Sequence, residues 1–212
     1  MRKLSIVLFL LSSLAASAGH AEPVKQNGFT TISPIFSQLV MFSLPADFTT
    51  VNEQSNDRQY IREAVLKGET VDQWSQMITV TGAKGLATEP QMSAQYFAAQ
   101  IAGGFQKACP NTFSVKPMGE VKISEHDAFV AVASCGKVDT SADKHSETAL
   151  IVAIKGVADV YTIQWAVRTP SSAENLTIDE AVWKQRLEKL TPIHVCPIIP
   201  GEKPPYPSCV NK

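Results

Sequence analysis

The sequence lacks the short motifs that identify many enzymes. It has no Gly-x-Ser-x-Gly elbow, and Ser134-Cys135-Gly136 lacks the glycine that would have to precede it. Gly82-Ala83-Lys84-Gly85 follows a predicted strand, but its spacing is not that of a phosphate-binding loop. It also has no Cys-x-x-Cys pair, which argues against a redox or zinc site built on the cysteines. None of these motifs therefore indicates a catalytic centre, a metal site or a bound cofactor.

No segment of the sequence concentrates positive or negative charge, and no long hydrophobic run follows the one at the N-terminus. The 19 Lys and Arg residues nearly balance the 20 Asp and Glu residues, and there is no basic stripe to hold a nucleic-acid backbone. No later segment is apolar enough to span a membrane. With 44% hydrophobic and 18% charged residues, the 212-residue chain has the balance of one globular domain.

The N-terminus has the pattern of a cleavable secretory signal. Arg2 and Lys3 form a positive end, an apolar run extends from Leu4 to Leu11, and small residues occupy positions 15–18. This run is shorter than the roughly 20 apolar residues that a membrane-spanning helix needs. We therefore expect residues 1–21 to be a signal peptide, the mature protein to be periplasmic or secreted, and no membrane insertion after cleavage.

Two positions fit the cleavage site of this leader. Cleavage can follow Ala18 or Ala21, and Pro23 just beyond the second position favours it. Removal of Arg2 and Lys3 with the leader changes the net charge from −1 to −3.

Four cysteines remain in the mature chain, and an even number in an exported protein indicates two disulfides. Three pairings are possible. We favour Cys109–Cys135 and Cys196–Cys209, because each joins nearest neighbours in the sequence and closes a loop of plausible size. In the chain-entropy account, loops of this size stabilise by about 3 kcal/mol each.

Short segments rich in β-branched and aromatic residues, separated by turn formers, predict an antiparallel sheet. The predicted strands cover residues 39–44, 60–65, 76–81, 121–123, 128–133, 148–155 and 160–165. Residues 52–58 and His126-Asp127 are expected to be turns, and Gly156–Asp159 the turn of a hairpin.

Two segments change to helical spacing. The first, residues 91–108, carries an apolar stripe that predicts a helix lying on the sheet. The members of this stripe are Phe97, Ile101, Phe105 and Ala108. The second helix is predicted to run from a capping box at Thr177–Glu180 to about Leu190, with Trp183 and Leu187 on its apolar edge.

These elements predict an α+β fold in which an antiparallel sheet carries two main helices. We expect an irregular lead-in over residues 22–38, one domain over residues 39–193 and a Pro-rich tail over residues 194–212. Six of the 13 prolines lie between Pro192 and Pro207, so the tail should be extended, and its disulfide would staple it back on the domain. A partner that recognises prolines is an alternative use of this tail.

Residues 41–48 form a strand that ends in Leu44-Pro45 and runs into Phe48. This opening resembles that of the PsbP and Mog1 superfamily, which includes the bacterial DcrB-type periplasmic proteins, and the order of elements agrees over roughly residues 39–190. The resemblance implies a bacterial protein with an α/β/α sandwich around an antiparallel sheet, and an accessory or binding role rather than catalysis. The two C-terminal cysteines and the Pro-rich tail depart from the family pattern.

The densest polar cluster is Glu125-His126-Asp127. Adjacent residues of an extended strand point to opposite faces, so these three converge only if a turn folds them together. A polar turn is the favoured interpretation, and an exported hydrolase that uses the three residues is the alternative.

The aromatic residues suggest a second kind of site. A ligand groove lined by rings, with Arg62 and Arg168 as polar anchors, is one interpretation. The rings are those of Trp74, Tyr161, Trp165 and Trp183. Burial in the core is the favoured interpretation of these rings, and Trp74 is the exception because its neighbours in the sequence are polar.

Together these patterns predict an exported, non-catalytic module that binds an unidentified protein or small ligand, without a cofactor. The residues predicted for ligand binding are Trp74, Arg62 and Arg168. A secreted effector or inhibitor that acts on a host or a competitor is a further alternative.

Overall fold

The computed structural model describes residues 28–138 and 145–211. Most of this chain forms a seven-stranded sheet in which all neighbouring strands are antiparallel. In order across the sheet the strands are β3 (Phe48–Ser55), β4 (Gln59–Leu66), β5 (Gln76–Ala83), β9 (Val160–Pro170), β8 (His145–Lys155), β7 (His126–Cys135) and β6 (Phe113–Ile123). The predicted α+β class with antiparallel pairing is confirmed.

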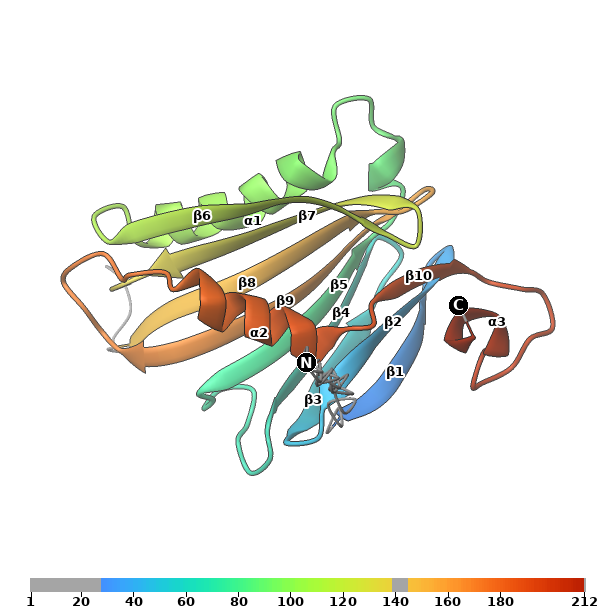
Figure 1. The fold of residues 1–212 in the computed structure, drawn as a ribbon, viewed down its shortest axis with the longest axis horizontal. Coiled ribbons are helices and arrows are strands. Elements are labelled where there is room, and N and C mark those ends of the chain that lie inside the picture. Colours follow the sequence, from blue (N-terminus) through green and yellow to red (C-terminus); the bar gives the residue numbers. More distant parts are fainter. Residues whose placement is uncertain (1–27, 139–144, 212) are drawn as a thin grey trace, which may run out of the picture.

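A smaller, three-stranded sheet and one helix pack on the first face of this large sheet (Figure 1). In order, the strands of the small sheet are β1 (Gly28–Ile35), β2 (Gln38–Pro45) and β10 (His194–Pro197). All eight residues of β2 are buried, because β2 is the central strand. The helix α2 (Glu180–Leu190) lies beside it and contributes Trp183 and Leu190 to the shared core.

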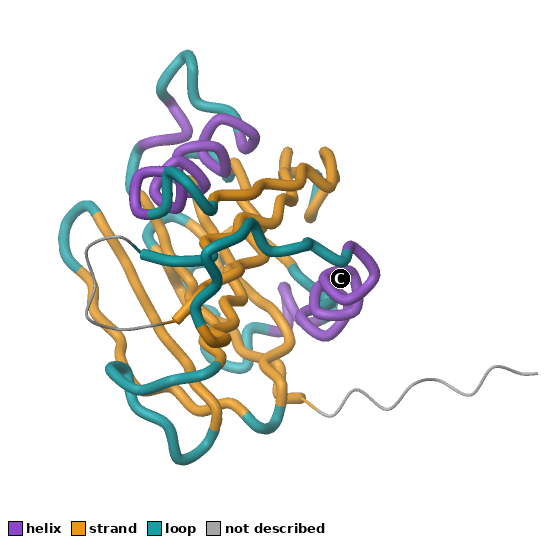
Figure 2. Tube along the Cα trace, turned by 90° about the vertical axis from the view of Figure 1, so that its left-hand side faces the viewer, coloured by secondary structure: helices purple, strands orange, loops and turns teal. Residues whose placement is uncertain are grey.

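The second face of the large sheet carries the helix α1 (Ala94–Ala108), which packs on β6, β7 and β8. Helical segments therefore lie on both sides of the strands (Figure 2). Two short pieces complete the fold: a 3₁₀ turn, η1 (Leu86–Thr88), and a C-terminal helix, α3 (Pro207–Val210). The first face of the large sheet is covered mainly by the strands of the small sheet. The described part of the fold therefore has many strands and few helices.

The predicted position of α1 is confirmed, and Phe97, Ile101 and Phe105 of the predicted stripe pack against the core under the helix, but the fully buried side chains of the helix are alanines. Ala94, Ala98 and Ala102 are buried there, with exposed fractions of 4%, 1% and 6%. Phe97 and Phe105 are only partly buried beside them. The strands below present small residues such as Ala131 and Ala133, so alanines allow the helix to approach closely. The rings are thereby moved to the flanks of the helix.

Three strands lie where the sequence predicts none or only part of one. β1 occupies residues 28–35 of the expected irregular lead-in, and β3 extends into the expected turn at residues 52–58. β6 begins at Phe113, well before the predicted residues 121–123. These strands are partly exposed and their polar residues give no apolar alternation, so the signal that identifies a half-buried strand is weak.

Two local predictions are corrected by the structure and one is confirmed. His126 and Asp127 begin β7, and the turn before them is Ser124-Glu125. α2 is capped by Asp179, whose side chain accepts a hydrogen bond from the amide of Ala181, and not by the predicted capping box at Thr177. The β8–β9 hairpin forms as predicted, with Lys155 opposite Val160.

Both predicted disulfides are present. Cys109–Cys135 ties the end of α1 to the end of β7, and Cys196–Cys209 ties β10 to α3. The second bridge packs on Leu39 of the small sheet. Residues 194–197, expected in the tail, pair with β2 and so belong to the folded body. The predicted signal peptide lies outside the described residues.

Candidate functional site

The half of the second face that lies beside α1 is polar. α1 packs on β6, β7 and β8, whereas β3, β4, β5 and β9 continue past it. The register places Asn52 opposite Glu63, and Glu63 opposite Thr79. Thr79 in turn lies opposite Gln164. Residues directly opposite one another share a face of the sheet, so these four form a polar row across it.

Hydrogen bonds between side chains orient this row. Asn52 Nδ2 donates to Glu63 Oε2 at 2.8 Å. Closer to the other end of β5, the hydroxyls of Thr81 and Thr162 are 2.6 Å apart, and Gln164 Nε2 donates to Thr162 Oγ1 at 3.1 Å. Each group keeps further donor or acceptor capacity after these bonds, because carboxylates, amides and hydroxyls offer more than one site.

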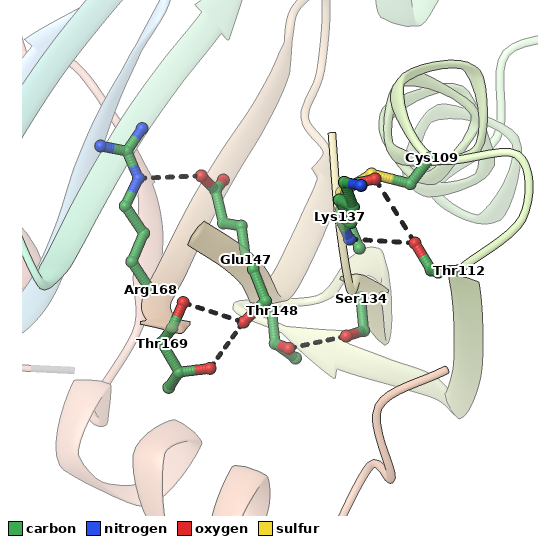
Figure 3. The surroundings of a disulfide bond; sticks show 10 residues. Cys109, Thr112, Ser134, Lys137, Glu147, Thr148, Arg168 and Thr169 are labelled. Carbon is green, nitrogen blue, oxygen red and sulfur yellow. Dashed lines mark hydrogen bonds and ion pairs between the residues drawn. A yellow bond between two sulfur atoms is a disulfide. The ribbon is translucent and has the colours of Figure 1, made fainter. Parts of the chain in front are cut away.

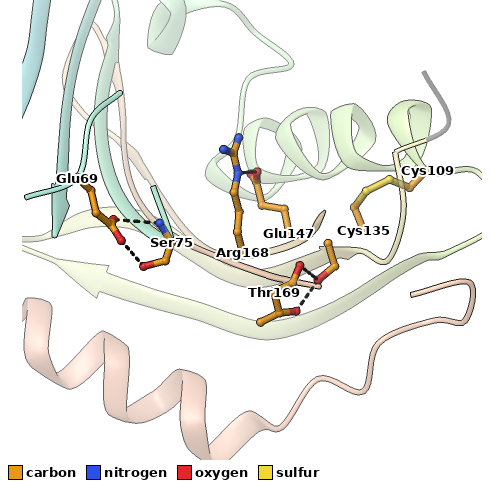
Figure 4. A network of polar contacts seen from close by, with 8 residues as sticks. Glu69, Ser75, Cys109, Cys135, Glu147, Arg168 and Thr169 are labelled. Atoms are coloured by element: carbon orange, nitrogen blue, oxygen red, sulfur yellow. Dashed lines mark hydrogen bonds and ion pairs between the residues drawn. A yellow bond between two sulfur atoms is a disulfide. The ribbon is translucent and has the colours of Figure 1, made fainter. Parts of the chain in front are cut away.

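A cation and an aromatic ring lie on the same face, four residues along β9 from Gln164 and beyond Met77 and Ala166. Arg168 on β9 lies opposite Glu147 on β8, and its Nε donates to Glu147 Oε2 at 3.3 Å. The guanidinium carbon is 3.7 Å from the ring centroid of Trp74, which lies in the β4–β5 loop. Figure 4 shows Arg168 and Glu147 rising side by side from the sheet toward α1, whereas Thr169 points the other way.

The loop that carries Trp74 is held by its own contacts. The carboxylate of Glu69 accepts from the amide of Ser75 at 3.0 Å and from its hydroxyl at 2.5 Å (Figure 4). The amide of Arg168 donates to the Ser75 carbonyl at 2.8 Å. Burial alone would raise the pKa of Glu69, but the hydrogen bonds from Ser75 outweigh it and lower that pKa. The ring of Trp74 is therefore positioned from both sides of the loop.

The Cys109–Cys135 disulfide lies on the same side of the sheet as Glu147 and Arg168 (Figure 3). Cys135 lies opposite Glu147 in the β7–β8 pairing. The bridge thus fixes the end of α1 beside the Arg168–Glu147 pair. Ser134 and Thr148 add a cross-strand hydroxyl contact of 2.7 Å on the opposite side of the same strands.

These side chains surround a hollow of about 360 Å³ between the β4–β5 loop, the sheet and α1. A second hollow of about 420 Å³ continues on the outer side of Trp74, toward His145. We call the two together the Trp74 groove. Its main lining consists of Glu63, Trp74, Thr79, Glu147, Gln164 and Arg168.

Of the three residues predicted to bind a ligand, the structure brings two together. Trp74 and Arg168 meet in the groove, whereas Arg62 points to the other face of the sheet. There its Nη1 donates to Ser33 Oγ at 2.7 Å, and its guanidinium lies 5.7 Å from the ring centroid of Phe42. Arg62 therefore joins the two sheets, and the prediction that it acts with Trp74 is wrong.

The proposed hydrolase residues do not converge. Asp127 pairs with Lys122 at 2.6 Å on the α1 side of the sheet, at a fully exposed position. His126 Nε2 lies 3.0 Å from Gln38 Nε2 near the small sheet. Glu125 lines a different hollow, beside α2. The three side chains thus point in three directions, as expected of a polar segment between strands.

The other predicted aromatic residues fill the core, as the favoured interpretation expected. Tyr161, Trp165 and Trp183 have exposed fractions of 0%, 4% and 6%. Within the described residues, no cluster of His, Cys, Asp and Glu has the composition of a metal site. None of the described helices is long and apolar enough to cross a membrane.

Sequence reasoning missed Glu63, Thr79, Glu147 and Gln164. A signal was present in β5 and β9, where polar residues such as Thr79 and Gln164 alternate with buried apolar ones. Such alternation indicates that one face of a strand is not packed in the core. The sequence does not show how the strands pair. This pairing is what places the four residues, on four strands, on the same face of the sheet.

No protein-family model matches this sequence, and no curated protein matches it. Similar solved structures include the Ran-binding protein Mog1p of Saccharomyces cerevisiae, at 12% identity and a TM-score of 0.47, over 79% of this chain and 95% of that chain. LpqN of Mycobacterium tuberculosis, involved in cell envelope biogenesis, has 10% identity and a TM-score of 0.36, over 82% of this chain and 88% of that chain. A protein from Bacteroides thetaiotaomicron has 14% identity and a TM-score of 0.40, over 84% of this chain and 51% of that chain.

Two Mog1 proteins, members of the superfamily that the opening strand resembles, are among the solved structures found. At such identities the similarity concerns the fold, and we transfer no residue role and no partner from them.

Proposed function

We propose that this chain is an exported, non-catalytic binding module that holds a neutral carbohydrate chain in the Trp74 groove. One observation carries the proposal: a row of hydrogen-bonding side chains on a sheet face lines the same hollow as an arginine stacked on a tryptophan. The row runs through Glu63, Thr79 and Gln164, and the stacked pair is Arg168 and Trp74.

The chemistry of the groove suits hydroxyl-rich ligands. Sugar hydroxyls both donate and accept, and the lining offers carboxylate acceptors, an amide that does both and a guanidinium donor. The apolar C–H face of a sugar ring packs on an aromatic ring, which Trp74 and the partly buried Phe105 provide. The carboxylates of Glu63 and Glu147 face one guanidinium, so a strongly anionic ligand would meet net repulsion.

A binding role fits the hydrogen bonds that the carboxylates of Glu63 and Glu147 already accept. Glu63 accepts a hydrogen bond from Asn52, and Glu147 accepts one from Arg168. Both groups are thus held as acceptors by neighbours in the folded protein. Export is supported by the two disulfides, which form and persist in oxidising compartments.

The test is a glycan array probed with the protein purified after export, followed by titration calorimetry on each glycan that binds. Trp74→Leu removes the stacking surface and Arg168→Gln removes the cation. We expect each change to weaken binding at least about tenfold. Arg58→Gln is the matched control, because Arg58 is exposed in the β3–β4 turn and lies outside the groove lining. It should keep the wild-type affinity.

Three results would contradict the proposal. The first is an array on which no glycan binds above background. The second is glycan binding that both groove variants leave unchanged. The third is release of reducing sugar from a bound glycan, or any ester hydrolysis that His126→Ala abolishes, since either would make the protein an enzyme.

A further inference from the structure

A second hollow, of about 570 Å³, lies on the first face of the large sheet, away from the Trp74 groove. One wall is the tip of the β6–β7 hairpin. The other is formed by the end of α2 and the start of β10. In Figure 1 the hairpin extends across the sheet toward β10, and α2 approaches from the other side. Two segments distant in the sequence, residues 121–125 and 187–194, therefore meet around one space.

The floor and walls of this hollow are apolar. Val130 of β7 and Val152 of β8 form the floor, with exposed fractions of 2% and 0%. Ile123 and Leu187, both partly buried, form the sides together with Ile193. An apolar hollow of this size is in the range that holds small molecules.

The mouth is polar and is built by an unusual turn. Ser124 and Glu125 both have positive φ angles, 47° and 68°, in a two-residue turn where Asn and Gly are the usual residues. The hydroxyl of Ser124 accepts from the amide of Val195 at 3.3 Å and lies 3.1 Å from His194 Nδ1. These contacts join the hairpin tip to β10 and hold the mouth in shape.

Charge at the mouth is uneven. Lys122 Nζ lies 2.6 Å from Asp127 Oδ1. This ion pair cancels most of the positive potential that Lys122 would add at the mouth. Glu125 is exposed at the same rim, so the mouth presents a hydrogen-bond acceptor of negative charge. A hydroxyl head group can donate to this carboxylate, whereas a carboxylate head group is repelled by it.

We propose that this hollow binds a small amphipathic alcohol, with its hydrocarbon body on Val130, Val152 and Leu187 and its hydroxyl donating to Glu125. The size favours a small molecule over a peptide, because the hollow measures about 570 Å³ and lies between the hairpin and α2. This site is independent of the Trp74 groove, which lies on the other face of the sheet.

The test is displacement of the fluorophore N-phenylnaphthylamine from the protein purified after export. We expect the fluorophore to bind saturably, decanol to displace it, and decanoate to need about tenfold higher concentration. Leu187→Trp fills the hollow and should abolish the displaceable signal. Val182→Trp is the matched control on the same helix, because Val182 is 40% exposed and outside the lining. It should bind like the wild type.

If Leu187→Trp does not fold, Glu125→Gln still tests the proposal. Glu125 is exposed, so this change should leave the fold intact. This change should bring the decanoate concentration to within about twofold of that for decanol. The proposal is overturned by decanoate displacing as well as decanol from the wild type, or by equal binding in Leu187→Trp and Val182→Trp. Loss of binding in Trp74→Leu would also overturn it, since that change should affect only glycans.

Discussion

The guanidinium carbon of Arg168 lies 3.7 Å from the ring centroid of Trp74, while the Nε of the same arginine donates to Glu147. The side chain of Arg168, on β9, thus contacts both the β4–β5 loop and the neighbouring strand β8. The ring has polar neighbours in the sequence and is only partly buried, which is unusual for a tryptophan in a small domain. Trp165 and Trp183 also have a guanidinium near their rings, that of Arg186, so partial exposure is what distinguishes Trp74 from these two core tryptophans.

The stacking of Arg168 on Trp74 can be measured by a double-mutant cycle. We expect a coupling free energy of about 0.5 to 1 kcal/mol from urea unfolding of Trp74→Leu, Arg168→Met and the double variant, as for partly exposed cation–π pairs. A control cycle pairs Trp74→Leu with Arg58→Met, for which no coupling is expected. A coupling at Arg168 no larger than that of the control would mean that the contact does not persist in solution.

Asp159 is expected to make stability depend on acid pH. It is only 2% exposed, and its carboxylate accepts from the amide of Ser37 at 3.0 Å, the amide of Gly85 at 2.7 Å and the hydroxyl of Tyr161 at 3.2 Å. Burial alone would raise the pKa of Asp159, but the hydrogen bonds from Ser37, Gly85 and Tyr161 outweigh it and lower that pKa. A carboxyl whose pKa is lower in the folded than in the unfolded state stabilises the fold above its unfolded pKa. This contribution is lost as the pH falls from about 4 through the folded pKa.

The change Asp159→Asn tests this role. Its amide nitrogen would face donors, so we expect the free energy of unfolding at pH 7 to fall by about 2 to 3 kcal/mol. The difference between wild type and variant should shrink as the pH falls below about 4 in urea titrations. Asp47→Asn, at an exposed position, should cost less than about 0.5 kcal/mol. A loss at Asp159 that is constant down to pH 2 would show that charge is not the cause.

Two glycines should respond to alanine in opposite ways. At Gly156 an added Cβ would overlap Gln38 Oε1 and come within 2.7 Å of the Tyr161 ring and 2.9 Å of the Asp159 carbonyl. At Gly104, inside α1, it would meet nothing within 4 Å. We therefore expect Gly156→Ala to destabilise by more than about 2 kcal/mol, and Gly104→Ala to stabilise by about 0.5 to 1 kcal/mol. Thermal melts of both variants provide the measurement, and a gain at Gly156 would contradict the close packing of this turn.

The sequence was sufficient where the local pattern was strong. The β8–β9 hairpin and the cores of β2, β4 and β5 follow from short segments of apolar, aromatic and β-branched residues bounded by turn formers, and both disulfides follow from their spacing in the chain. The burial of Trp165 and Trp183 followed from the usual fate of large rings at strand and helix spacing. In each of these cases the information lies within a few residues of the position predicted, or in the count of cysteines.

Tertiary structure decided which residues of different strands lie opposite one another and on which face of the sheet each side chain lies. Periodicity predicted that Phe97 and Phe105 pack on the sheet, and they do so partly buried, but only the structure shows that Ala98 and Ala102 fill the centre of the contact opposite the small residues of β7 and β8. Arg62 and Arg168 look alike in the sequence, yet they lie on opposite faces because the pleat alternates along each strand. The polar row of the groove, and the hollow behind Ser124, exist only because strands far apart in the chain are aligned by backbone hydrogen bonds. No pattern within one segment carries that alignment.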